Sequence, residues 1–219
     1  FRDIVHQYCK GHPWARFGID LCIGSEADQP ITQRQMMFAP FYLMDAFDGA
    51  QIKGDSIQRP LITANELIVD ATPEPDESDW MPTPLQCSLL LFILTAAATI
   101  YGIRRRTGLW GIDLFLFGIA GIVGCVLAFL ALFSQHPAVS SNFLLLVFHL
   151  GQLLFLPYIV YCVRKGKKCW YLTLNLVVLT LFIVLFPVIP QRFDFAVVPL
   201  ALCLLIRSVS NLIVTSKKK

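Results

Sequence analysis

The sequence predicts a mainly α-helical, polytopic membrane protein, in which a five-helix transmembrane bundle follows a polar α+β region. The 219 residues have a mean hydropathy of +0.62, and only 15% of them are charged, whereas soluble domains carry about 25% charge. The acids are also segregated, because thirteen of the fifteen precede Trp80 and only Asp113 and Asp194 follow it. The net charge of +3 therefore sums an acidic front and a basic back, and it gives no indication of nucleic-acid binding.

In the polar region, residues 1–71, apolar side chains at helical spacing predict two short helices. The first begins at the start of the chain and stops at Gly11, since glycine commonly ends a helix. The second begins at Pro13, a residue suited to a first helical turn. Its apolar face carries Trp14, Phe17 and Leu21.

Local signals also organise the rest of this region. Thr32 and Gln35 have the spacing of a capping box, which predicts a helix that breaks near Pro40 and continues to about residue 49. Residues 50–70 read as short strands with a Gly-Asp turn. Residues 72–84 form an acidic, proline-rich linker.

About seventy residues are few for an independent core, so we expect residues 1–71 to be the C-terminal part of a larger domain. The chain starts at Phe1 rather than Met and has no signal peptide. We expect it to be a fragment or a mature form.

Five apolar runs in residues 85–219 are each long enough to cross a hydrocarbon core of about 30 Å as a helix. The predicted spans are residues 85–103, 109–133, 143–163, 170–189 and 195–214. The second span has a smooth face for close helix approach, formed by Gly118, Gly121 and Gly124.

Basic residues predict the orientation of these spans. Lys and Arg cluster at residues 104–106, 164–168 and 217–219, whereas the other two breaks hold a single basic residue, Arg192. Short basic loops stay in the cytoplasm. The polar region is thus expected to be the α+β tail of a periplasmic domain, with the C-terminus in the cytoplasm.

A few polar residues fall within the predicted spans. His149, Gln152 and Asn175 are either functional groups or partners in interhelical hydrogen bonds worth about 0.6 kcal/mol. Asp113 lies near enough to the cytoplasmic end of its span to be hydrated. Arg207 lies where it can extend toward that surface.

Few residues outside the spans suggest chemistry. His136 and Asn142, in the external loop between the second and third spans, are candidates for substrate contact at the membrane surface, although a loop histidine is more often only solvated. His6 and Cys9 are three residues apart, so a helix would place them on neighbouring positions as a possible Cys–His catalytic couple. An isolated pair at this spacing often occurs by chance, so we do not expect it to be catalytic. Cys9 and Cys22 face an oxidising compartment and could pair, but their spacing does not require it. No metal-ligand spacing occurs, so we expect no metal.

Several blocks of sequence together resemble one known family. They are His12-Pro13-Trp14, Phe17-Gly18-Ile19-Asp20, Gly24, Ala27-Asp28, Met37-Phe38, Pro40, Leu43, Arg59-Pro60-Leu61, "FSQHPAVSSN" and "PLALCLLIRS". In this order they resemble the later part of the periplasmic domain and the membrane helices of the Lnb-type lipoprotein N-acyltransferases. Nearly the whole chain is covered.

The resemblance implies a bacterial inner-membrane enzyme with a papain-like, NlpC/P60-related domain. Such an enzyme takes an acyl chain from a membrane lipid or lipoprotein as a thioester on a Cys, with a His as base. It passes the chain to the α-amino group of a lipoprotein's lipidated N-terminal Cys. No cofactor is implied, and the partners are membrane lipids and lipoprotein substrates.

In that family the catalytic Cys and His belong upstream of Phe1, so no catalytic residue is expected in this chain and the fragment should be inactive. Trp14, Arg16, Asp20 and Asp28 are then expected to support a neighbouring active site. The alternatives are a non-enzymatic membrane anchor or scaffold and a papain-like cell-wall peptidase.

Overall fold

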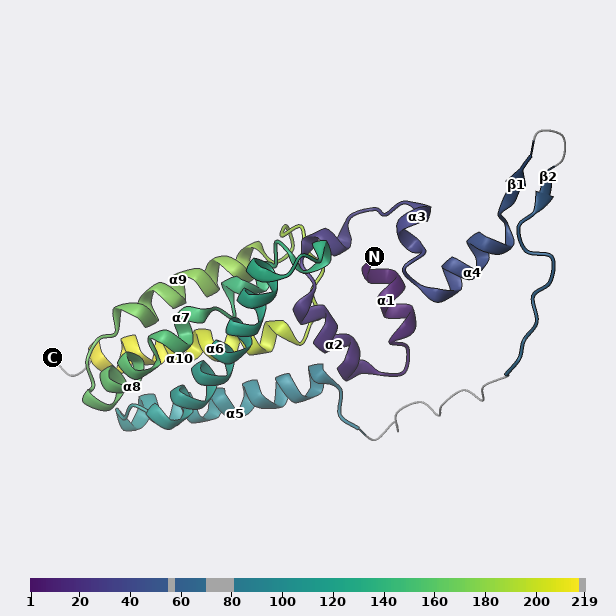
Figure 1. Ribbon diagram of the computed structural model, residues 1–219. Helices are drawn as coiled ribbons and strands as arrows, with labels where there is room; N and C mark the ends of the chain where they lie inside the picture. Colours follow the sequence, from purple (N-terminus) through teal and green to yellow (C-terminus); the bar gives the residue numbers. More distant parts are fainter. Residues whose placement is uncertain (55–57, 70–80, 217–219) are drawn as a thin grey trace.

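A computed structural model describes residues 1–54, 58–69 and 81–216 (Figure 1). A bundle of long helices forms one part of the molecule, and a smaller part built from residues 1–69 lies at one end of it. The hydrophobic core lies inside the bundle, where Phe117, Ile159, Leu172 and Leu179 are fully buried.

The two predicted N-terminal helices are present. Helix α1 (Arg2–Tyr8) ends before Gly11, whose φ of 85° turns the chain into α2 (Pro13–Cys22). Pro13 occupies the first turn of α2, as expected, because its fixed φ suits a helix start. The short 3₁₀ helix η1 (Ser25–Asp28) follows.

The capping box is also confirmed. Thr32 and Gln35 exchange both of its hydrogen bonds at the start of α3 (Gln33–Met36), and α4 (Pro40–Asp48) begins at the proline that breaks the helix. Strands β1 (Gln51–Lys53) and β2 (Gln58–Pro60) pair antiparallel. Part of their predicted Gly-Asp turn and most of the predicted linker, residues 72–80, lie outside the described residues.

Three predicted spans appear as single long helices, within about two residues of their expected bounds. Helices α5 (Pro84–Arg105), α6 (Trp110–Phe133) and α10 (Val197–Ser216) are long and apolar enough to cross a membrane. Helix α5 starts at Pro84 behind a second capping box, between Thr83 and Gln86.

The five-helix bundle is not confirmed. The third predicted span is divided into η3 (Phe143–Leu146), α7 (Leu150–Leu154) and α8 (Leu156–Lys165), and α9 (Trp170–Leu185) stops four residues short of its predicted end. Helices α8 and α9 are long and apolar enough to cross a membrane only when taken together, and they are bent by 112° relative to each other. The described residues therefore contain three candidate spans, or four if this bent pair is one span.

The third segment breaks at two positions, His149 and Pro157. His149 has an extended backbone, with φ −133° and ψ 152°, directly before α7. Pro157 lies in the first turn of α8, where it has no N–H to continue a preceding helix. The predicted smooth face of α6 packs here, since a Cβ on Gly121 would lie 2.5 Å from the Leu153 nitrogen and one on Gly124 2.6 Å from the His149 backbone.

Two expectations for charged residues in the bundle are wrong. Asp113 is only 1% exposed and Arg207 only 2%, so the first is not hydrated and the second does not reach the surface. They form a two-pronged ion pair, in which Arg207 Nε lies 2.6 Å from Asp113 Oδ1 and Nη2 lies 3.0 Å from Oδ2. Arg207 Nη1 also donates to Thr99. Pairing removes the reason for either charge to seek water.

The uncharged polar residues of the bundle bond to neighbouring segments. Asn175 donates to Ser208 Oγ across the α9–α10 contact, as the interhelical interpretation predicts. Gln152 donates to the Val147 carbonyl, and His149 Nδ1 lies 3.5 Å from the Tyr171 hydroxyl.

Candidate functional site

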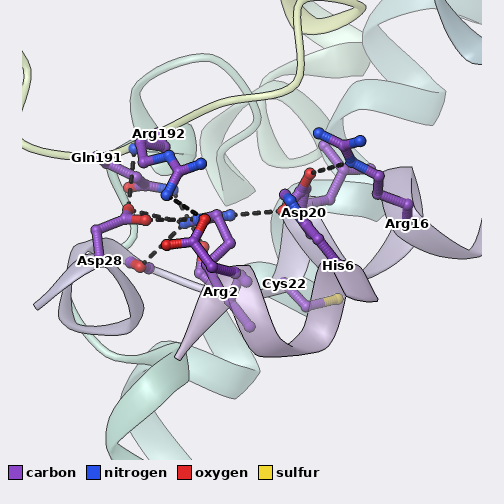
Figure 2. A network of polar contacts seen from close by, with 12 residues as sticks. Arg2, His6, Arg16, Asp20, Cys22, Asp28, Gln191 and Arg192 are labelled. Atoms are coloured by element: carbon purple, nitrogen blue, oxygen red, sulfur yellow. Dashed lines mark hydrogen bonds and ion pairs between the residues drawn. The ribbon is translucent and has the colours of Figure 1, made fainter. Parts of the chain in front are cut away.

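The polar region meets the bundle through a network built around Arg2 (Figure 2). This side chain is only 2% exposed, although it starts a helix outside the bundle. Its Nη1 lies 2.7 Å from Asp20 Oδ1 in α2, and its Nε and Nη2 lie 2.6 and 3.0 Å from the two Asp28 oxygens in η1. Burial opposes the charge of Arg2, but the hydrogen bonds that Arg2 donates to Asp28 and Asp20 outweigh this effect and raise its pKa. Arg2 therefore stays charged and ties α1, α2 and η1 together.

Two further basic side chains contact Asp20. His6 Nε2 lies 2.8 Å from Asp20 Oδ1, and Arg16 Nε lies 3.9 Å from Oδ2. Helical spacing explains the second contact, because residues four apart share a helix face. Asp20 itself is 3% exposed, whereas the Arg16 side chain is 51% exposed. Asp20 orients the His6 ring, while Arg16 keeps its guanidinium accessible.

The loop between α9 and α10 joins the same network. The Arg192 backbone nitrogen donates to Asp28 Oδ2 at 2.9 Å, and its side chain lies 2.6 Å from Asp3 Oδ1. The hydrogen bond from Arg192 lowers the pKa of Asp3, although both side chains are exposed. One ion-pair network thus spans both parts of the molecule.

A second set of contacts, the Asn142–Gln191 clamp, lies beside this network. Asn142 Nδ2 donates to the Leu21 carbonyl at 2.7 Å, and Gln191 Nε2 donates to the Ile23 carbonyl at 3.1 Å and to Asn142 Oδ1. Both amides are buried. The clamp holds the end of α2 against two interhelical loops of the bundle.

Gly24 allows this close approach. Its nitrogen donates to the Ala138 carbonyl at 2.8 Å, and a Cβ added to it would lie 1.9 Å from the Ser140 carbonyl oxygen. Any side chain at this position would push the polar region off the loop. Glycine is thus required by packing rather than by an unusual backbone angle.

A cavity of about 640 Å³, here called the junction cavity, opens where the two parts meet. Its wall includes Arg2, His6, Arg16 and Asp20 from the polar region, the start of α5, and most of residues 186–195 before α10. It combines ionic side chains with apolar ones at the end of the bundle. Such a lining suits a ligand with a polar head and an apolar tail.

The structure brings together only some of the predicted site residues. Arg16, Asp20 and Asp28 belong to the network, whereas Trp14, 40% exposed, donates from Nε1 to the Pro82 carbonyl and packs edge-on against Phe17. These contacts are compatible with the predicted supporting roles, which stay predictions.

The two predicted substrate contacts lie elsewhere. His136 Nδ1 accepts from the Ala138 nitrogen, and its ring edge faces Phe1. The Asn142 side-chain amide makes the hydrogen bonds of the clamp and also accepts one from the Leu144 nitrogen. Neither residue lines the junction cavity, and substrate contact by either one stays a prediction.

Sequence reasoning missed Arg2, Gln191 and Arg192. A signal for the first was present, because Arg2 and His6 are four residues apart in the first helix and so share one face. The two loop residues gave none, since their partners in the polar region lie more than 150 positions away.

The two cysteines of the polar region, Cys9 and Cys22, are free thiols and are not bonded to each other. Burial raises the pKa of the Cys22 thiol, which disfavours the reactive thiolate. Among residues 1–54, 58–69 and 81–216, no group of three His, Cys, Asp or Glu side chains is placed to hold a metal ion.

Comparison with known proteins identifies the membrane half. No curated protein and no solved structure matches the chain. The family model described as the Lnb transmembrane domain matches residues 76–219, well over half of the chain. The chain therefore belongs to the Lnb transmembrane domain family.

Proposed function

We propose that the chain is the membrane part of an Lnb-type lipoprotein N-acyltransferase in the bacterial inner membrane. The enzyme transfers an acyl chain to the α-amino group of the lipidated N-terminal Cys of a lipoprotein. Transfer passes through a thioester on a Cys whose base is a His. In this proposal both residues lie outside the chain, as the resemblance implies.

The observation that carries the proposal is the family match across residues 76–219. The junction cavity adds support, because it lies where an apolar bundle meets an ionic region. Donor and acceptor of this reaction are both attached to lipid, so they meet most readily at such a boundary. The network and the clamp would hold the polar region, and with it a neighbouring active site, at a fixed height above the bilayer.

The distribution of basic residues supports a periplasmic position for residues 1–69. Helix α5 ends with Arg104 and Arg105, and α8 ends with Arg164 and Lys165. These ends and that of α10 lie at the end of the bundle opposite to α1 (Figure 1). Basic ends stay in the cytoplasm, so in this proposal the junction cavity lies at the outer surface.

Mass spectrometry of lipoprotein N-termini tests the proposal. The full-length gene is expressed in a strain without its own lipoprotein N-acyltransferase, and we expect N-acylated lipoproteins to appear. Diacylated N-termini in the presence of a well-expressed protein would contradict the proposal. New cell-wall peptide fragments in the same strain would identify a peptidase instead, and no change in either would identify an anchor.

A supporting role for Trp14 is tested in the same strain. We expect Trp14→Ala to lower folding yield and N-acylation together, because the indole joins α2 to the segment before α5. Normal folding with selective loss of turnover would instead assign Trp14 a direct part in the reaction.

A further inference from the structure

A groove runs between α5 and α6 on the side of the bundle. Helix α5 packs along α10, whereas α6 packs against α7 and α8, so α5 and α6 border a gap. Two cavities of about 220 and 390 Å³ lie in this gap and share Leu91, Phe115 and Leu116. The two cavities adjoin at these shared residues and are here together called the α5–α6 groove.

The lining of the α5–α6 groove fits hydrocarbon. Its floor includes Leu116 and Leu204, which are 7% and 2% exposed, and its rims include Leu94 and Phe115, which are 59% and 58% exposed. Among the residues that the structure describes, no charged side chain lines it. Both rims belong to candidate membrane spans, so its open side faces the acyl chains of the bilayer.

Helix α2 connects the groove to the junction cavity. Phe17 and Leu21 cover the groove, while Arg16 and Asp20 of the same helix line the junction cavity. Leu85 of α5 lines that cavity and Leu91 lines the groove, about 9 Å further along the helix at a rise of about 1.5 Å per residue. The two hollows are thus arranged as an amphiphilic molecule requires, polar at the outer end and apolar below.

We propose that the α5–α6 groove binds one acyl chain of a membrane phospholipid, whose phosphate lies beside Arg16 in the junction cavity. Arg16 Nε is 3.9 Å from Asp20 Oδ2, beyond hydrogen-bonding distance, and its side chain is half exposed. Its guanidinium is therefore able to bind a phosphate. This assignment rests on the proposed function, in which such a lipid supplies the acyl chain.

Photo-crosslinking in vesicles tests the assignment. The chain is reconstituted in phosphatidylethanolamine and phosphatidylglycerol with a small fraction of phosphatidylethanolamine that carries a diazirine in one acyl chain. After irradiation, adducts are mapped by peptide mass spectrometry. We expect them to concentrate on groove residues of α5 and α6 rather than on the other lipid-facing positions.

Two matched pairs of variants test the site. Ala98 lines the groove and Ala97 does not, so we expect Ala98→Phe to lower groove adducts at least threefold and Ala97→Phe to leave them unchanged. A second pair lies on α6, where Ile119 lines the groove and Ile122 does not. If Ala98→Phe does not fold, Ile119→Trp should lower groove adducts and Ile122→Trp should leave them unchanged. Arg16→Gln should weaken labelling by the phospholipid but not by a diazirine fatty alcohol, which has no phosphate.

Three results would overturn the proposal. Even labelling around the bundle, with equal adducts in Ala98→Phe and Ala97→Phe, would indicate only the lipid that surrounds any membrane protein. Disulfide-linked dimers of Leu94→Cys, without groove adducts, would indicate a second copy in the groove. Equal labelling by both probes in Arg16→Gln would remove the phosphate contact. Because labelling requires no acyl transfer, groove adducts combined with a failure of the full-length protein to N-acylate lipoproteins in the strain assay would refute the proposed function alone.

Discussion

Two buried arginines, one in each part of the molecule, organise it in different ways. Arg2 and Arg207 are both 2% exposed, and each makes a two-pronged contact with a carboxylate. Arg2 also shares a second carboxylate, Asp20, with His6 and Arg16. Arg207 has Asp113 as its one carboxylate partner among the described residues, and Thr99 as a further acceptor.

The surroundings of the two arginines differ more than their geometry. Arg2 borders the junction cavity of about 640 Å³, whereas Asp113 and Arg207 border a void of only about 10 Å³. A buried ion pair without space beside it can only hold helices together. A shared network on the wall of a cavity can also bind a ligand. The Arg2 network is therefore a candidate for function, whereas the Asp113–Arg207 pair has a structural role.

The largest effect is expected at Asp113. Asp113→Ala leaves Arg207 buried without its carboxylate, which should lower the free energy of unfolding by about 3–5 kcal/mol. Thermal unfolding in detergent, followed by tryptophan fluorescence, measures the loss. The control is Asp113→Leu combined with Arg207→Met, which should be more stable than Asp113→Ala because neither charge remains. Wild-type stability of Asp113→Ala would contradict the structural role.

A smaller loss is expected for Asp20→Asn, about 1–3 kcal/mol. Arg2 loses one of its two carboxylates but keeps Asp28. Limited proteolysis of residues 1–28 should become faster in this variant. Asp45→Asn on the exposed surface of α4 serves as the control, and equal proteolysis rates in the two variants would contradict the network.

Gly24→Ala tests the docking of the two parts without changing a charge. The new Cβ would meet the Ser140 carbonyl at 1.9 Å, and we expect a cost of about 1–3 kcal/mol from overpacking. The same proteolysis assay detects release of the polar region. Gly18→Ala is the matched control in α2, because nothing lies within 4 Å of its Cβ. A harmless Gly24→Ala would mean that the loop and the polar region are not in contact.

The smallest effect is expected at the exposed end of the network. The Asp3 and Arg192 side chains are 72% and 58% exposed, so Asp3→Asn should cost at most about 1 kcal/mol, and less at high salt. Since Arg192 lowers the pKa of Asp3 below its ordinary value of 3.8, this contribution is present above that value. It is lost as the pH falls through the lowered pKa. Urea titrations at pH 7 and at pH 2 measure the difference, and a larger effect in acid would contradict the pairing.

Local signals predicted much of the fold. Pro13, the capping box of Thr32 and Gln35, and the lengths of α5, α6 and α10 depend on neighbouring residues or on hydropathy alone. The break before α7 depends instead on tertiary contact, because the backbone of His149 packs against Gly124 of α6. Hydropathy is averaged over a whole segment, so it does not register one extended residue.

The candidate site was only partly predictable. Asp20 and Asp28 were singled out through a family resemblance, but their common partner Arg2 lies 18 and 26 positions away. Arg207 and Asp113 are 94 positions apart. Periodicity gives no information on such pairs, and a single buried charge leaves no pattern in the sequence.

The central claim is that the bundle holds residues 1–28 on the outer face of the membrane, where the junction cavity receives lipid. Cysteine labelling with a membrane-impermeant maleimide tests it most directly, in a background with the seven native cysteines replaced by alanine. Gln29→Cys lies beside η1 and Thr107→Cys beside the basic end of α5, both at exposed positions. We predict that Gln29→Cys is labelled in intact spheroplasts and that Thr107→Cys is labelled only after lysis. The reverse pattern would contradict the orientation and the proposed work on exported lipoproteins.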